Sequence, residues 1–121
     1  MIDPEEYDLV LIDCPPNFNV VTKTAIVASS HILIPAKPDY LSTLGIDYLT
    51  RSLRTLVDDY NEYAELDSGG VDEQISPEIL GVMFTMVQEY GGGPISSIRP
   101  FMTQTEQLGI SVFEAYIKEN C

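Results

Sequence analysis

The chain has 121 residues and a formal net charge of −13, from 19 acidic and 6 basic residues. This length predicts one domain with a hydrophobic core. The excess of carboxylates disfavours strong direct binding to DNA, which depends on lysine and arginine neutralising phosphates. No apolar run approaches the ~20 residues that a membrane-spanning helix needs. Two cysteines make no disulfide framework, so we expect a protein of the reducing cytoplasm, without a membrane partner.

The first predicted element is a short buried strand, Leu9–Asp13. Four apolar residues precede Asp13, and Pro15 and Pro16 follow it. Proline lacks an N–H donor and fixes φ, so the strand is expected to end there. A short run without polar alternation is typical of a strand buried on both faces of a parallel sheet. Asp13 is therefore expected at the carboxyl end of a parallel strand, where open α/β sheets bind ligands.

Six further elements are predicted, alternating between helix and strand. They are a helix at Phe18–Ala28, a strand at His31–Ile34, a helix from Ser42 or Thr43 to Tyr63, a strand at Ile79–Met86, a helix near Ile95–Leu108 and a strand near Ser111–Tyr116. Asn17 or Asn19 is a suitable N-cap for the first of these helices. Apolar residues repeat every three or four positions along the second helix. This alternation predicts an α/β fold with a mostly parallel sheet covered by helices.

Several short motifs occur in a fixed order along the chain. They are Asp13-Cys14-Pro15-Pro16, Ile34-Pro35-Ala36-Lys37-Pro38, Leu44-Gly45-Ile46, the strand Ile79–Val87 with its Thr-Met ending, and Gly109–Asn120. In this order they resemble the ParA/Soj-type partition ATPases, a group related to the MinD ATPases. The resemblance implies a three-layer, partial P-loop NTPase-like domain that spans residues 1–121.

The resemblance also implies which residues lie near a nucleotide. Intact members of the family bind ATP and Mg²⁺, and Asp13 corresponds to an aspartate that is associated with Mg²⁺ through water when nucleotide is present. Pro15, Thr85 and Met86 correspond to positions on the nucleotide-binding side. Lys37 follows a strand end and would face either the nucleotide or a partner, or else solvent.

The phosphate-binding loop of the family is absent from these residues. No G-x-x-x-x-G-K-[ST] sequence occurs in the chain, and in the family this loop precedes the Asp13 strand. We therefore expect a truncated portion of a partition ATPase that binds no cofactor and is catalytically inactive by itself. The alternative is a non-catalytic interaction module that pairs with an intact partition ATPase or another partner. Because a central strand would be missing, we also expect a homo-oligomer.

Each candidate residue also has a purely structural interpretation. Asp13 would bond to the Pro-Pro turn, Cys14 would be a small packed residue, His31 would lie at a strand edge, and Thr85 and Met86 would belong to the core. The eight acidic residues within 58–78 fit a solvated helix end and loop. The glycine-rich segment Glu89–Pro94 is predicted to be a loop before the third helix, because it lacks the residues that contact phosphate.

Overall fold

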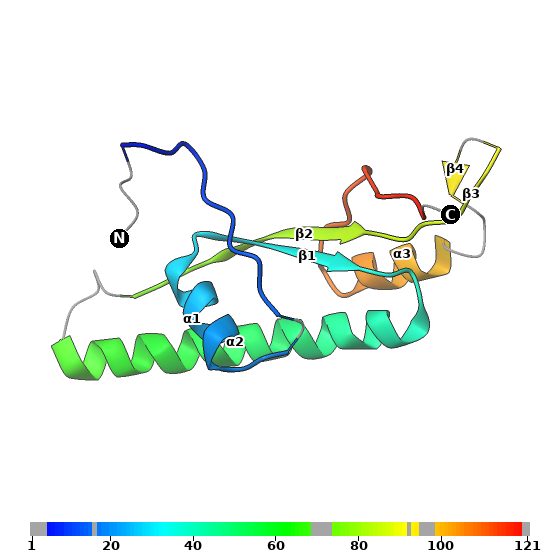
Figure 1. Cartoon of the computed structure of the whole chain (residues 1–121). Helices are drawn as coiled ribbons and strands as arrows, with labels where there is room; N and C mark the ends of the chain where they lie inside the picture. Colours follow the sequence, from blue (N-terminus) through cyan, green and yellow to red (C-terminus); the bar gives the residue numbers. More distant parts are fainter. Residues whose placement is uncertain (1–4, 16, 69–73, 92, 95–98, 120–121) are drawn as a thin grey trace.

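The computed structural model describes residues 5–15, 17–68, 74–91, 93–94 and 99–119. Its elements, in chain order, are α1 (Val20–Ala28), β1 (His31–Ala36), α2 (Tyr40–Ser68), β2 (Glu78–Phe84), β3 (Glu89–Tyr90), β4 (Gly93–Pro94) and α3 (Arg99–Gln107) (Figure 1). The α/β fold is thus confirmed, and the predicted alternation of helix and strand holds from α1 to β2. The predicted bounds of α2 were too short at both ends, and residues 95–98 of the third predicted helix lie outside the described part.

The sheet is built around β2. β1 pairs with β2 in parallel, from His31 opposite Glu78 to Ala36 opposite Phe84. The other edge of β2 bonds to the C-terminal segment, where Val82 N–H donates to the Ser111 carbonyl at 2.8 Å. This segment makes isolated parallel bridges at Val112 and Lys118, so the predicted strand Ser111–Tyr116 is not formed as a regular strand. β2 is therefore the central strand and has backbone partners on both sides.

The hydrophobic core lies between the sheet and α2. Its buried members come from β1, α2, β2 and the segments that follow β2 and α3, namely Ile34, Ile46, Val82, Phe84, Val87 and Ile110. Alternate residues of β1 point to this core, since Ile34 is 5% exposed whereas Leu33 is 46% exposed. Figure 1 shows α2 running along the strands and α3 lying near the carboxyl ends of β1 and β2. One face of the sheet is thus covered by helices.

A bulge shifts the register between β1 and β2. Ile32 lies opposite Ile79 and Leu33 lies opposite Gly81, so Leu80 is the extra residue on β2. Gly81 has φ of 147°, and a Cβ built there would lie 2.7 Å from the Ser111 carbonyl oxygen. A residue other than glycine would be strained both by its backbone angle and by this contact. Gly81 therefore lets the C-terminal segment approach the centre of the sheet.

The predicted strand Leu9–Asp13 is wrong. Residues 5–15 belong to no helix or strand, and they form the blue trace that passes in front of the sheet in Figure 1. Their side chains are exposed, including Leu9 at 75% and Leu11 at 85%. A buried strand needs backbone partners and apolar neighbours, and this segment has neither a ladder nor core contacts. The apolar run indicates a tendency to form a strand, but the described residues do not provide its partner.

None of the helices in the described part of the chain combines the length and the apolar character that crossing a bilayer would require.

Candidate functional site

The carboxyl ends of β1 and β2 meet at one edge of the sheet. Thr85, just after β2, donates its backbone N–H to the carbonyl of Ala36, the last residue of β1, at 2.8 Å. The Thr85 hydroxyl lies 3.5 Å from the same oxygen and is half-buried. This arrangement holds the two strand ends together. Ligands of open α/β sheets bind at this edge, so we take it as the candidate functional site.

Met86 has a backbone conformation that is uncommon for its side chain. Its φ is 56°, in the left-handed region, and its side chain is 46% exposed. Such a conformation costs an L-residue about 1–2 kcal/mol. Hydrogen bonds fix the next residue, because Val87 N–H donates to Ile117 O and Glu119 N–H donates to Val87 O. The alternative interpretation of Met86 as a core residue is therefore wrong, because the turn presents its side chain to solvent.

Asp39 organises the start of α2 at the same edge. Its carboxylate accepts a hydrogen bond from the backbone N–H of Ser42 at 2.7 Å, and its carbonyl accepts from Thr43 N–H. These bonds make Asp39 the N-cap of the helix. The bonds from the Ser42 backbone and side chain, followed by the charge of Lys37, hold the pKa of the Asp39 carboxyl below its ordinary value. Sequence reasoning missed this residue, although an aspartate immediately before a helical apolar pattern is a recognisable N-cap signal.

The C-terminal segment is attached to this edge through Tyr116. Its hydroxyl donates to a carboxylate oxygen of Glu89 at 3.0 Å. Partial burial, followed by the hydrogen bond to Glu89 and its negative charge, raises the pKa of the Tyr116 phenol. Glu89 begins the two-stranded hairpin β3–β4, which the sequence analysis had treated as a loop. The tyrosine therefore links the hairpin to the residues beside β2.

Asp13 and Pro15 are not brought to this edge. Both are exposed and lie in the segment 5–15, outside any strand. Cys14 is also exposed, and its thiol lies 3.7 Å from the Ile12 carbonyl, so its predicted packed position is wrong. The structure thus separates the four predicted site residues into two groups. Thr85 and Met86 belong to a formed turn, whereas Asp13 and Pro15 belong to a segment without secondary structure.

Two other predicted positions are found where the sequence placed them. His31 begins β1 with an exposed side chain, and its Nε2 lies 3.7 Å from a Glu78 carboxylate oxygen. Lys37 follows the carboxyl end of β1 and is exposed. Neither residue contacts a second functional side chain at the candidate site. The strand-edge interpretation of His31 is confirmed.

Two pockets occur away from the carboxyl edge. The first, of about 340 Å³, lies between α2, the amino-terminal parts of the strands and residues 108–111. The second, of about 440 Å³, is an open cleft between α1 and α2. Neither is lined by Asp13, Thr85 or Met86. Among the described residues no group of three or more histidine, cysteine, aspartate or glutamate residues is placed to hold a metal ion. In the positions that the structure gives them, Asp13, Thr85 and Met86 do not form a site that fits a Mg²⁺-nucleotide.

Asn61 is a structural residue that sequence reasoning missed. Its side-chain amide donates to the Ile75 carbonyl at 2.8 Å, and its oxygen accepts from the Ile75 N–H at 2.6 Å. The paired bonds anchor the chain that returns from α2 to β2. No pattern in the sequence indicates this contact, because the partners are separated by 14 positions in an acidic, glycine-containing stretch.

Comparison with known proteins identifies the family. The family model described as an AAA domain matches residues 2–66, just over half of the chain. The cell division protein PomZ of Myxococcus xanthus is 32% identical over 90 residues, which cover 70% of this chain and 28% of that protein. The chain belongs to the AAA-domain family of ParA/Soj-type partition ATPases. The resemblance that the sequence motifs suggested is thus confirmed.

Two further relatives match shorter stretches of the chain. The chromosome partitioning protein ParA of Myxococcus xanthus is 38% identical over 48 residues, and the sporulation initiation inhibitor protein Soj of Bacillus subtilis is 34% identical over 50 residues. These alignments cover 40% and 41% of this chain and 17% and 20% of the relatives. The chain thus spans between about one sixth and just over one quarter of the length of these curated relatives. No solved structure matches it.

Proposed function

We propose that this chain is part of an ATP-dependent partition system that positions DNA or protein cargo in the cytoplasm. The observation that carries the proposal is the match of residues 2–66 to the family, together with relatives named for chromosome partitioning and cell division. The turn at Thr85 and Met86 supports it, because this turn lies at the ligand-binding edge of a parallel sheet. In the intact ATPase these residues would lie beside the nucleotide.

Within this proposal, Asp13 acts only after its segment has joined the sheet. A carboxylate associated with Mg²⁺ needs the phosphates of a bound nucleotide, because Mg²⁺ keeps several waters and binds through few protein ligands. Asp13 is exposed and outside the sheet in the structure. Pairing of residues 9–13 with a neighbouring strand would bring Asp13 to the carboxyl edge that Thr85 already occupies. Asp13 and Pro15 are thus proposed to join Thr85 and Met86 only in the intact ATPase.

The 121 residues are proposed to be inactive by themselves. Hydrolysis of ATP requires backbone N–H groups and a lysine around the β- and γ-phosphates, and the chain contains no Gly-x-x-x-x-Gly-Lys sequence. Titration calorimetry of the purified chain with Mg-ATP should show no saturable binding below the millimolar range. Micromolar binding, or turnover that is lost in the Asp13→Ala variant, would contradict the proposal.

A test of the parent function uses the DNA immediately upstream of this coding sequence. An in-frame glycine-rich loop with its lysine would make the chain the continuation of a partition ATPase. The longer protein should then hydrolyse ATP, and Asp13→Ala should abolish turnover while Asp8→Ala, an exposed matched control, should not. An upstream sequence without such a loop would remove the support for the ATPase proposal.

The exposed apolar residues of segment 5–15 favour a second candidate function. Tyr7, Leu9 and Leu11 are each more than half exposed, and exposed apolar surface of this kind marks an interaction site. In this case the chain would be a non-catalytic module that pairs with an intact partition ATPase. Purified chain should then bind the purified ATPase, and Leu11→Glu should weaken binding at least tenfold. Equal binding by the variant and the parent chain would exclude this module.

A further inference from the structure

The face of α2 that points away from the sheet has an unusual composition. A surface helix normally places polar residues opposite its core-facing side. Here, large apolar side chains are exposed near both ends of the helix: Leu41 at 78%, Leu44 at 52%, Tyr48 at 67%, Tyr63 at 69% and Leu66 at 80%. At 3.6 residues per turn, these five positions fall within an arc of about 100°. The core-facing residues Ile46, Leu53 and Ala64 lie on the opposite side.

This outer stripe is symmetric about its own midpoint. Its positions are Leu41, Leu44, Tyr48, Ser52, Thr55, Asp59, Tyr63 and Leu66, and the spacing reads the same from either end. If a second α2 lies antiparallel, Leu41 faces Leu66, Leu44 faces Tyr63, Tyr48 faces Asp59, and Ser52 faces Thr55. All four pairs are centred on the same point, between Leu53 and Arg54. A two-fold axis through this point brings the same surface of both copies together, as an isologous dimer requires.

The chemistry of the paired positions is complementary. The outer pairs are apolar, and the Tyr48 hydroxyl is a donor facing the Asp59 carboxylate. The central pair, Ser52 and Thr55, is small, which allows the helices to approach closely. Both Thr55 and Asp59 are exposed, so neither is covered within one chain.

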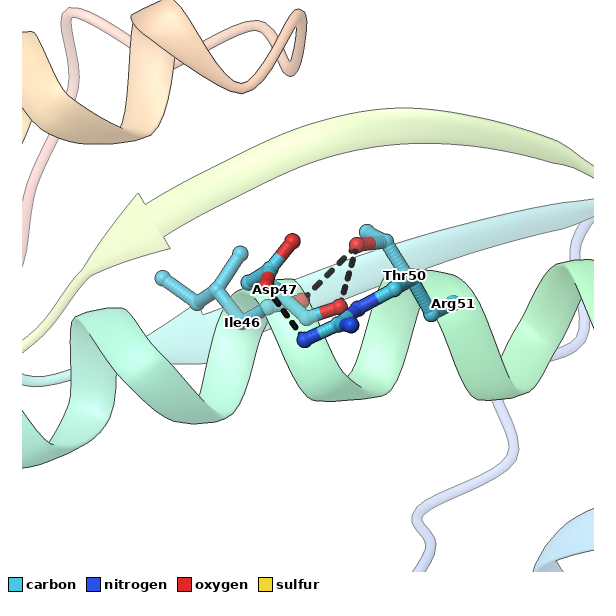
Figure 2. Close-up of polar contacts among 4 residues, drawn as sticks. All are labelled: Ile46, Asp47, Thr50 and Arg51. Atoms are coloured by element: carbon cyan, nitrogen blue, oxygen red, sulfur yellow. Dashed lines mark hydrogen bonds and ion pairs between the residues drawn. The ribbon is translucent and has the colours of Figure 1, made fainter.

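The charges along α2 favour the same orientation. Residues 40–54 contain one carboxylate and two guanidinium groups, whereas residues 55–68 contain five carboxylates and no cationic side chain. A parallel pair would place the two acidic halves against each other. An antiparallel pair instead places Arg51, at the edge of the stripe, opposite the start of the acidic half of the second copy. Arg51 is 70% exposed although it pairs with Asp47 at 2.6 Å, as Figure 2 shows, so it can contact a second carboxylate.

α1 lies beside the stripe. Phe18 and Lys23 line the open cleft between α1 and α2, together with Tyr48, Ser52, Thr55 and Asp59 of the stripe. Lys23 lies 5.5 Å from the centre of the Phe18 ring and is exposed. It adds a cation beside the centre of the stripe. The α1 segment thus flanks the centre of the stripe.

From this symmetry and charge pattern we infer that two copies of the chain associate through antiparallel α2 helices, with the two-fold axis between Leu53 and Arg54. The interface uses neither the carboxyl edge of the sheet nor the segment 5–15. It is therefore independent of the proposed nucleotide function, and it differs from pairing at an open strand edge.

Light scattering tests the association. The parent chain should have a mass near twice 13.4 kDa at tens of micromolar, and Leu44→Glu or Tyr63→Glu should raise the dissociation constant at least tenfold. Leu11→Glu is the matched control, because it places the same charge at an exposed leucine in segment 5–15 and should leave the dimer intact. A monomeric parent chain, or a dimer that dissociates in Leu11→Glu but not in Leu44→Glu, would overturn the inference.

Cysteine cross-linking tests the register. In a Cys14→Ser, Cys121→Ser background, chains carrying Ser52→Cys are mixed with chains carrying Thr55→Cys and then oxidised. The mixture should give a disulfide-linked dimer, and each variant alone should give much less. Efficient cross-linking of Ser52→Cys with itself would indicate a parallel pair and would contradict the antiparallel arrangement. Circular dichroism of each variant confirms that α2 is retained.

Discussion

Segment 9–12 and strand β2 are both short apolar runs, yet only β2 is buried. Val82 and Phe84 of β2 are 0% exposed, whereas Leu9 and Leu11 are 75% and 85% exposed. β2 has β1 on one edge and the C-terminal segment on the other, and segment 9–12 has no such neighbour among the described residues. The difference shows that an apolar run becomes a buried strand only when backbone partners are available on its edges.

The largest expected effect is a difference in the free energy of unfolding between two variants, one in each region. Phe84→Ala should lower the free energy of unfolding by about 3–5 kcal/mol, because it opens a cavity in the core. Leu11→Ala should change it by less than about 0.5 kcal/mol, because the leucine is exposed. Urea denaturation measures both values. A similar loss for the two variants would show that segment 9–12 is buried in solution.

A second prediction addresses the centre of the sheet. Gly81→Ala should cost roughly 2–3 kcal/mol, because the added Cβ meets the Ser111 carbonyl and the backbone angle is strained. Gly45→Ala is the control, since Gly45 lies in α2 with open space around it and alanine has the higher helix propensity. It should stabilise the protein by about 0.5–1 kcal/mol. Equal effects at both glycines would contradict the close approach of the C-terminal segment.

A third prediction concerns α1, which connects the two regions. Asn19 accepts a hydrogen bond from Thr22 N–H at 3.1 Å and thereby caps the helix. Asn19→Ala should cost about 1 kcal/mol, whereas Asn19→Asp should retain most of the stability. Thermal unfolding of the two variants measures the difference. If α1 began elsewhere in solution, alanine and aspartate at position 19 would behave alike.

The smallest expected effect is a dependence on pH. The folded-state pKa of Asp39 is lowered from 3.8, so its contribution is present above pH 3.8 and is lost as the pH falls through the lowered value. The melting temperature of Asp39→Ala should therefore be below that of the parent at pH 6, and the gap should narrow towards pH 2. A gap that is constant with pH would show that the carboxylate charge is not involved.

The sequence predicted α1, β1, α2 and β2 because each carries its own local signal. Asn19 caps α1, and α2 places Ile46 and Leu53 on one face at helical spacing. The sequence failed where a structure depends on distant partners. Nothing near Asp13 indicates whether its segment has a neighbouring strand, and nothing near Asn61 indicates its bonds to Ile75. Of the predicted site, only the Thr85–Met86 turn forms, because it follows a strand that is paired on both edges.

Amide hydrogen exchange tests the comparison between the two regions most directly. The N–H groups of Val82, Thr85 and Val87 donate to Ser111, Ala36 and Ile117 and should exchange slowly. The amides of Leu9 to Ile12 should exchange at nearly the rates of an unfolded peptide. Protection of residues 9–12 by about a hundredfold or more, comparable to that of β2, would contradict the account and would show that this apolar run is a strand of the sheet.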